Sequence, residues 1–229
     1  MWWARIRQCL LDPLPNGLPP GWKMLLDGLG YTLLITALAT LVGVALGTAV
    51  GILRMSRFRL LRWPARVYAD VIRGTPVLVQ LFIINFIVFA SVQADKWLVG
   101  VIAFGLNSAA YVSEIVRAGI QSVNPGQMDA ARSLGMPTRT AMREIILPQA
   151  FRNILPALGN EFVVLLKETS VVGFIGGMDL MRTGDIIRSK TYEAYVPLLT
   201  VAAVYLVLTL GFSALLQRWE RGLSWGRDK

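Results

Sequence analysis

The chain is organised around residues 124–148, which read NPGQMDAARSLGMPTRTAMREIILP and lie between two apolar segments. Asn124 is a favourable cap for a helix that begins at Pro125, where the missing N–H costs nothing. Gln127 follows at the position from which its side chain can reach back to the cap, and Gly135 lies where the helix would end. The stretch is too polar to cross a bilayer and reads as a folded loop.

The second half of this stretch has its own signals. Pro137 permits another helical start, and Pro148 is expected to close the loop before the next apolar run. Asp129, Ala130 and Ala131 place one acidic and two small side chains in the middle of the first helix, so that another surface could approach its backbone closely. We expect two short helices joined by a glycine break at a membrane surface. They form either an ordinary amphipathic loop on lipid headgroups or a socket for a soluble partner.

The same residues follow one another at fixed separations. Asp129, Ala130 and Ala131 are followed, after three residues, by Gly135 and, after nine more, by Ile145, with Leu147 and Pro148 completing the series. This pattern resembles the coupling motif of the transmembrane (permease) subunits of ATP-binding-cassette (ABC) importers. That motif usually begins with glutamate, and aspartate keeps its charge. The resemblance implies that these seven residues couple the chain to a cytoplasmic ATPase.

The composition is that of a membrane protein. Of 229 residues 55% are hydrophobic and 16% charged, and the mean hydropathy is +0.54. The net charge of +9 arises from basic residues between apolar runs, which indicates orientation in a membrane and argues against a nucleic-acid partner. One cysteine and no histidine exclude an internal disulfide and the usual zinc, haem and cysteine–histidine sites.

The apolar runs predict an all-α membrane protein with five transmembrane helices. These spans are drawn from residues 25–53, 74–94, 98–120, 151–176 and 194–217, the fourth being interrupted by Glu161, Lys167 and Glu168. In the first span Gly43, Gly47 and Gly51 recur every fourth residue, which predicts a close helix–helix seam. We therefore expect an interfacial segment and linker over 1–24, a permease domain over 25–217 with a coupling loop at about 121–149, and a tail over 218–229.

The basic residues predict the orientation of these spans. The side that holds the link Arg54–Arg73, the link Arg117–Arg152 and the tail carries 15 of the 23 lysines and arginines, and the other side carries seven. Because basic residues concentrate in cytoplasmic loops, the N-terminus is expected outside and the C-terminus inside. The coupling loop is then cytoplasmic, as its motif requires.

Five further segments extend the resemblance to importers of polar amino acids: residues 73–76 (RGTP), 107–111 (NSAAY), 113–119 (SEIVRAG), 158–161 (LGNE) and 167–170 (KETS). The resemblance implies a type I ABC importer architecture in a bacterial inner membrane. It implies a second permease copy or a paralogue, two cytoplasmic ATP-binding subunits and an extracytoplasmic amino-acid-binding protein as partners. This chain has no Walker-type loop, so it would bind no cofactor, and the partner ATPase would use ATP and Mg²⁺.

Several polar residues are expected near the middle of the membrane. Counting from the span ends at about 1.5 Å per residue places Asn85, Asn107 with Ser108, and Asn160 with Glu161 at one common depth. A carboxylate at that depth is energetically unfavourable unless it pairs with a cation or contacts water. We expect Glu161 to bind the substrate ammonium and the other four residues to line the path. The alternative is that these groups tie helices together by hydrogen bonds.

The end of the fourth span offers a candidate gate. Lys167 and Glu168 lie near its external end, where they could form a gating ion pair or contact separate partners. Glycines at 173, 176 and 177 predict a bend, and the mixed charges of residues 178–193 offer a docking surface for a binding protein or merely a solvated face.

Two other function classes stay open. The chain could be a stand-alone secondary transporter or channel that uses Glu161 as an ion or proton site, although no inverted repeat is evident and the coupling motif would then have no role. An intramembrane enzyme would need a catalytic pair that the sequence does not offer convincingly. Dependence of uptake on a separate ATPase distinguishes the importer from both.

Overall fold

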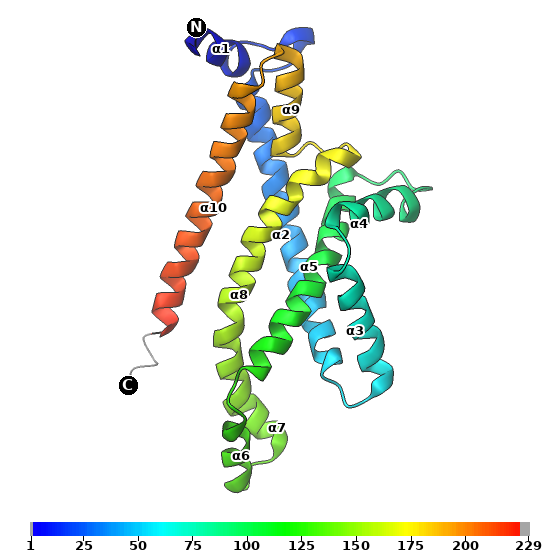
Figure 1. The fold of residues 1–229 in the computed structure, drawn as a ribbon, viewed down its shortest axis with the longest axis vertical. Coiled ribbons are helices and arrows are strands. Elements are labelled where there is room, and N and C mark those ends of the chain that lie inside the picture. The colour runs from blue at the N-terminus through cyan, green and yellow to red at the C-terminus, as the bar shows by residue number, and fades with distance from the viewer. Residues whose placement is uncertain (1, 225–229) are drawn as a thin grey trace.

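The computed structural model describes residues 2–224, and all regular elements in that part of the chain are helical (Figure 1). The α-helices are α1 (Trp2–Ile6), α2 (Gly21–Arg54), α3 (Arg59–Arg73), α4 (Val77–Ile83), α5 (Lys96–Gln121), α6 (Pro125–Ser133), α7 (Thr138–Ala141), α8 (Leu147–Glu168), α9 (Leu180–Thr191) and α10 (Tyr195–Ser224). Shorter π-helical turns cover Arg7–Leu11, Ile84–Val88 and Met142–Ile146, and 3-10 turns cover Pro15–Gly17 and Thr169–Ile175.

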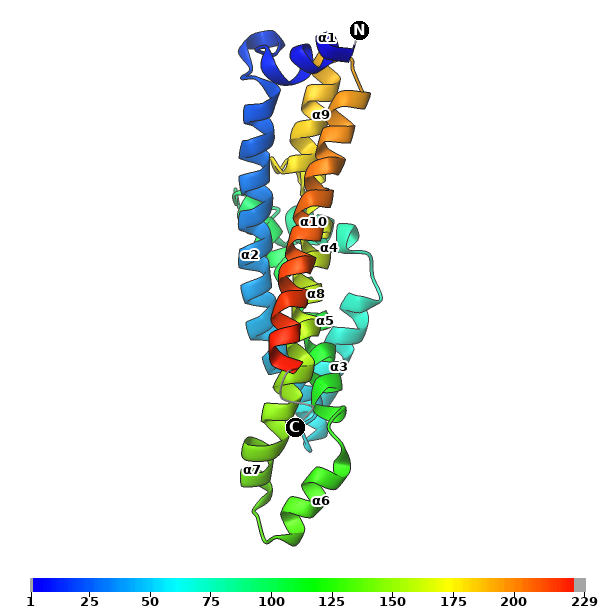
Figure 2. The same ribbon diagram turned by 90° about the vertical axis from the view of Figure 1, so that its left-hand side faces the viewer.

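The long helices run along one axis of an elongated molecule (Figures 1 and 2). Helices α2, α5, α8 and α10 lie along this axis, with α1 and α9 at one end and α6 and α7 projecting from the other. Helix α10 starts beside α9 and runs towards the end that carries α6 and α7. It extends through residues 218–224 of the expected tail, whereas residues 225–229, with Arg227 and Lys229, lie outside the described residues.

The N-terminal segment packs onto the end of the bundle that carries α9. Trp2 and Trp3 are exposed, whereas Cys9 and Leu14 are buried in a cluster with residues of α2, α9 and α10. Helix α2 already begins at Gly21, so the last residues of the expected linker are helical.

The glycines of the first predicted span form the expected seam between α2 and α5. A Cβ atom at Gly47 would lie 2.6 Å from Val112 Cβ and 2.7 Å from the Ala109 carbonyl oxygen. Positions Gly43 and Gly51 meet α5 in the same way, one turn to either side. The prediction is confirmed, and only glycine permits this approach of the two helices.

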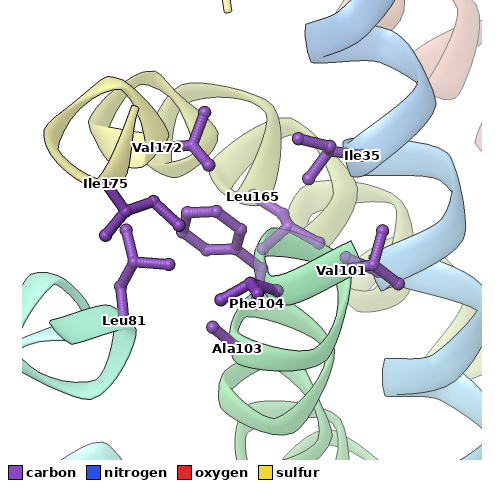
Figure 3. Close-up of a cluster of buried hydrophobic side chains, with 10 residues drawn as sticks. Ile35, Leu81, Val101, Ala103, Phe104, Leu165, Val172 and Ile175 are labelled. Carbon is purple, nitrogen blue, oxygen red and sulfur yellow. The ribbon is translucent and has the colours of Figure 1, made fainter. Parts of the chain in front are cut away.

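Phe104 of α5 lies at the centre of the largest apolar cluster (Figure 3). Its fully buried ring is surrounded by Ile35 of α2, Leu81 of α4, Leu165 of α8 and Val172 of the 3-10 turn that follows α8. The cluster fixes the shorter elements onto the α2–α5 pair.

An unbroken second span over 74–94 is a wrong prediction. The preceding basic link is itself helical as α3, and α4 with its π-helical continuation to Val88 is turned from α3 by 109°. The turn occurs because Thr75 precedes a proline, which disfavours helical backbone, and Pro76 has no N–H to continue the ladder. The part after the turn is too short to cross a bilayer by itself.

Three helices of the described chain are long and apolar enough to span a membrane, namely α2, α5 and α10, and the bent α3–α4 pair offers a fourth. Helix α8 has 22 residues but, as expected, is interrupted by charged side chains. Exposed leucine and valine side chains along α10 are consistent with a surface that faces lipid.

Residues 124–136 form the expected capped helix and glycine break, but the Gln127 side chain makes no hydrogen bond to the cap among the described residues. Helix α6 begins at Pro125, and Asn124 Oδ1 accepts a hydrogen bond from the Gly126 N–H at 2.8 Å. Gly135 has a φ of +80°, and the Met136 N–H donates to the Ala131 carbonyl at 3.1 Å, so the helix ends at a left-handed glycine.

Pro148 does not close this loop, contrary to expectation. Helix α7 continues through the π-helical turn Met142–Ile146 directly into α8, and Pro148 lies in the first turn of α8. A proline is tolerated there because the helical register changes at the π-helical turn and its N–H is not needed. Helix α7, the π-helical turn and α8 therefore form one continuous helical path.

Candidate translocation pathway and coupling loop

Ser108 and Glu161, two of the residues expected at one depth, meet between α5 and α8. The Ser108 hydroxyl donates to Glu161 Oε1 at 2.9 Å, and the two residues are 0% and 9% exposed. Gly43 of α2 backs this contact, since a Cβ there would lie 2.7 Å from Ser108 Oγ. The carboxylate thus has one hydrogen-bonding side-chain partner and no basic partner among the ion pairs of the described chain.

Asn107 supports the bend between α3 and α4. Its Nδ2 donates to Gln80 Oε1 at 3.0 Å, while Gln80 Nε2 donates to the Ile72 and Thr75 carbonyls at 2.7 and 3.0 Å. Gln80 therefore satisfies carbonyl groups that the turn leaves without helical donors. Sequence reasoning missed Gln80, although an amide side chain four residues after Pro76 was the available signal.

Asn85 and Asn160 do not share the environment of Glu161. Asn85 Oδ1 accepts at 2.9 Å from Nζ of Lys96, the first residue of α5, whose Cα lies about 16 Å along that helix from that of Asn107. The expected common depth is wrong for Asn85, because the bend before α4 invalidates a count along a straight axis. Asn160 is exposed, next to the buried Glu161.

A cavity of about 760 Å³ opens between α5, α8 and the far end of α10. Its lining is Glu114, Ile115, Ala118, Gly119, Ser122, Arg152, Asn153, Pro156, Ala157 and Glu220. Glu161 lies one turn beyond Ala157 on α8, about 6 Å further along the axis. The cavity thus ends about one helical turn short of Glu161, and neither Ser108 nor Glu161 lines it.

The region after α8 bends as its glycines predict. A 3-10 turn follows Glu168, and Gly176 ends it with a φ of +89°. Lys167 is exposed and Glu168 half-buried, and they form no ion pair with each other among the described residues. The structure thus gives the candidate gate no direct contact between its two charges.

The charged link after this turn is largely a helix, α9. Asp179 is fully buried at its N-terminus and accepts from the Met181 and Arg182 N–H groups at 3.0 and 3.4 Å, so it is a helix cap and contributes nothing to a surface. Asp185, by contrast, forms ion pairs with Arg182 and Arg188 at 3.2 and 2.6 Å on the exposed face.

The coupling-motif residues divide into outward and inward groups. Asp129 and Ala130 are exposed, and Leu134 at the tip of the loop is 83% exposed. Ala131 is 2% exposed, so its small side chain serves packing within this chain and does not meet an outside surface as expected. Ile145 is half-buried beside the apolar cluster of α5 and α8, and Gly135, Leu147 and Pro148 are exposed.

A charged cluster near the end of α5 was not predicted. Glu114 forms ion pairs with Arg54 at 2.9 Å, with Arg73 at 3.3 Å and with Arg117. Arg73 also lies over the Tyr111 ring, 5.7 Å from its centroid. The cluster joins α2, α3 and α5, and its sequence signal was the i, i+3 spacing of Glu114 and Arg117.

Residues 29–225 match the family described as binding-protein-dependent transport system inner membrane component. The chain belongs to this family. It is 40% identical over 193 residues to a putative glutamine transport system permease protein, GlnP, of Rickettsia prowazekii (strain Madrid E), covering 83% of this chain and 88% of that protein. It is 40% identical over 206 residues to the arginine transport system permease protein ArtQ of Bacillus subtilis (strain 168), covering 89% and 94%.

Solved structures support this family assignment. A crystal structure of an amino acid ABC transporter with histidines has a chain that is 49% identical, with a TM-score of 0.84 over 87% of this chain and 94% of that chain. An inward-facing structure of the MetNI methionine ABC transporter, 19% identical with a TM-score of 0.76 over 87% and 96%, shares the fold. This chain is thus an inner-membrane component of an ABC import system.

Proposed function

We propose that the chain is the permease subunit of an ATP-driven amino-acid importer and that it forms the wall of the translocation pathway. The named functions of its relatives, glutamine and arginine transport, support an amino-acid substrate. The observation that carries the site assignment is the buried Ser108–Glu161 pair one turn beyond the end of the 760 Å³ cavity. A carboxylate without a basic partner at the end of an accessible path is suited to receive an ammonium group.

The residues expected to line the pathway have different roles, because their surroundings differ. Glu161 binds the substrate ammonium, and Ser108 orients the carboxylate. Asn107 contributes through the adjacent bend. Asn85 acts with Lys96, from which it accepts a hydrogen bond, and Asn160 is exposed on α8 beside Glu161. The competing role, a hydrogen bond that only holds α5 to α8, predicts a loss of stability on substitution and no selective loss of transport.

The topology has five spans: α2, the bent α3–α4 pair, α5, α8 and α10. Together they form the permease domain over 25–217, preceded by the interfacial segment 1–24. The N-terminus is external and the tail 218–229 is cytoplasmic, which the distribution of basic residues supports. The coupling loop at about 121–149 then lies on the cytoplasmic side.

The coupling loop docks on a cytoplasmic ATPase subunit through its outward residues. The contact surface is formed by Asp129, Ala130 and Leu134. The other motif residues maintain the shape of the loop and its junction with α8: Ala131, Gly135, Ile145, Leu147 and Pro148. Helix α8 then acts as a lever between the ATPase and Glu161. Lys167 and Glu168, near the external end of this lever, adjust the external gate through separate partners.

The assembly has two permease copies or a permease and a paralogue, two ATP-binding subunits that use ATP and Mg²⁺, and an extracytoplasmic amino-acid-binding protein. This chain itself is no enzyme. The exposed pairs of Asp185 with Arg182 and Arg188 offer the binding protein a mixed-charge surface on α9.

The deciding experiment is to solubilise native membranes gently, purify this chain and identify what accompanies it. We expect a stoichiometric ATP-binding subunit, and a cysteine crosslinker at Ala130→Cys should capture it, because Ala130 is exposed and the native Cys9 is buried. A second five-span protein would indicate a heterodimer. If neither purification nor crosslinking finds an ATP-binding protein, the chain is a stand-alone transporter that uses Glu161 as an ion or proton site.

A further inference from the structure

A second cavity, about 400 Å³ in volume, opens where the ends of α2 and α5 meet α3. Four of its lining residues are arginines, Arg54, Arg62, Arg66 and Arg117, and the others are Met55 and Gln121. This cavity shares none of its lining residues with the candidate pathway, and Glu114, which lines that pathway, pairs with Arg54 and Arg117 of this one.

The guanidinium groups of this cavity exceed the anionic groups available to them. Glu114 is the carboxylate that pairs with the cluster, and both its oxygens are already occupied by Arg54, Arg73 and Arg117. Arg62 and Arg66 form no hydrogen bond or ion pair among the described residues. Arg54 is buried, and its Nε has no partner in the described chain. Because Arg62 and Arg66 line the cavity without a carboxylate or other acceptor from the described chain, the cavity has the properties of an anion site.

The faces of α3 indicate where this anion comes from. Leu60, Trp63, Val67 and Val71 recur at three- and four-residue steps and are 86%, 70%, 40% and 54% exposed, so they form an apolar stripe that no part of the described chain covers. Ala65 and Ala69 form the buried face. The arginines at 59, 62, 66 and 73 follow a third row, which lies between the apolar stripe and the buried face.

We propose that this arginine cavity binds the phosphate of an anionic phospholipid whose acyl chains lie along the exposed apolar stripe of α3. The planar guanidinium fork matches phosphate oxygens, and basic cavities between transmembrane helices are suited to anionic headgroups. A free phosphate would use the same arginines but would leave Leu60, Trp63, Val67 and Val71 without a partner. The bound lipid supplies the acceptors that Arg62 and Arg66 lack. The proposal does not depend on the identity of the transported substrate.

The test uses the intact permease–ATPase complex, released from nanodiscs of mixed phosphatidylglycerol and phosphatidylcholine and analysed by native mass spectrometry. We expect phosphatidylglycerol to be retained in preference to phosphatidylcholine, at a fixed number per permease copy. The double variant Arg62→Gln/Arg66→Gln should reduce this preference about 30-fold, since each arginine near the headgroups contributes about 1 kcal/mol. Neither side chain has a partner within the described chain, so the variant should keep its thermal stability in zwitterionic detergent.

The matched control is Arg57→Gln/Arg218→Gln, which removes the same charge from two exposed positions outside the cavity. Retention in the control should stay within about twofold of the wild type. Equal losses in both double variants would mean diffuse surface attraction and would overturn the proposal. Displacement of phosphatidylglycerol by millimolar inorganic phosphate would identify a free-anion site. Absence of retained lipid, with a crosslink from Arg62→Cys to the ATPase, would assign the cavity to a protein contact.

Discussion

Replacement of Glu161 by glutamine gives the sharpest test of the pathway. The variant keeps the side-chain volume. In the wild type the Ser108 hydroxyl donates to the Glu161 carboxylate at 2.9 Å, and in the variant it can donate to the amide oxygen instead. The change therefore removes a negative charge from a site that is 9% exposed and leaves the α5–α8 contact intact. A hydrogen bond to a charged group contributes about 1.5–3 kcal/mol and a neutral one about 0.5–1.5 kcal/mol. The difference of roughly 1–1.5 kcal/mol predicts an about 5- to 13-fold loss of substrate transport.

The assay is the initial rate of amino-acid uptake into proteoliposomes that contain the permease, its ATPase and the binding protein. The matched control is Asp70→Asn, the same chemical change at an exposed position of α3. Assembly is checked by co-purification of the ATPase, which both variants should retain. If uptake by Glu161→Gln equals that of the control, Glu161 has a structural role only and the reasoning fails.

Three further experiments test the coupling loop, the helix seam and the N-terminal segment. Ala130→Arg should leave ATPase activity measurable but uncouple it from uptake, whereas Ala131→Arg, at a position that is 2% exposed, should reduce folded protein yield. Gly47→Leu should destabilise the protein by at least about 1–3 kcal/mol in detergent unfolding, since its Cβ would lie 2.7 Å from a carbonyl oxygen of α5. Gly30→Leu is the control and should not destabilise the protein, because a Cβ at position 30 has nothing within 4 Å. Burial raises the pKa of the Cys9 thiol and hides it from reagents. A maleimide should therefore label Cys9 at least about tenfold more slowly than the cysteine of Ala130→Cys. Equal labelling rates would contradict the packing of the N-terminal segment.

The features predicted well from sequence depend on local chemistry. The start of α6 follows from the Asn124 cap and Pro125, and its end from a glycine at position 135 that can adopt positive φ. The α2–α5 seam was also readable, because glycines spaced by four residues lie on one helical face. In both cases neighbouring residues in the sequence contain the whole reason for the structure.

The features that were missed depend on contacts between distant segments. Hydropathy could not reveal the turn of α4 against α3, and this turn moved Asn85 away from the depth of Glu161. Asp179 reads as a surface charge in the sequence, yet it is a fully buried helix cap. Arg54 and Arg73 looked like ends of a basic link, since their pairing with Glu114 requires α2, α3 and α5 to meet.

The unbroken helical path from α7 through α8 determines how far Glu161 moves when the α7 end is tilted. Thr138 and Glu161 are separated by about 35 Å along this path at about 1.5 Å per residue. A tilt of about 5° around the α7 end would displace the Glu161 carboxylate by about 3 Å over that radius. That displacement equals the length of its hydrogen bond to Ser108, 2.9 Å. A rotation of the loop by a few degrees is therefore enough to exchange the partner of a buried charge far from that loop, with no need for any helix to unwind.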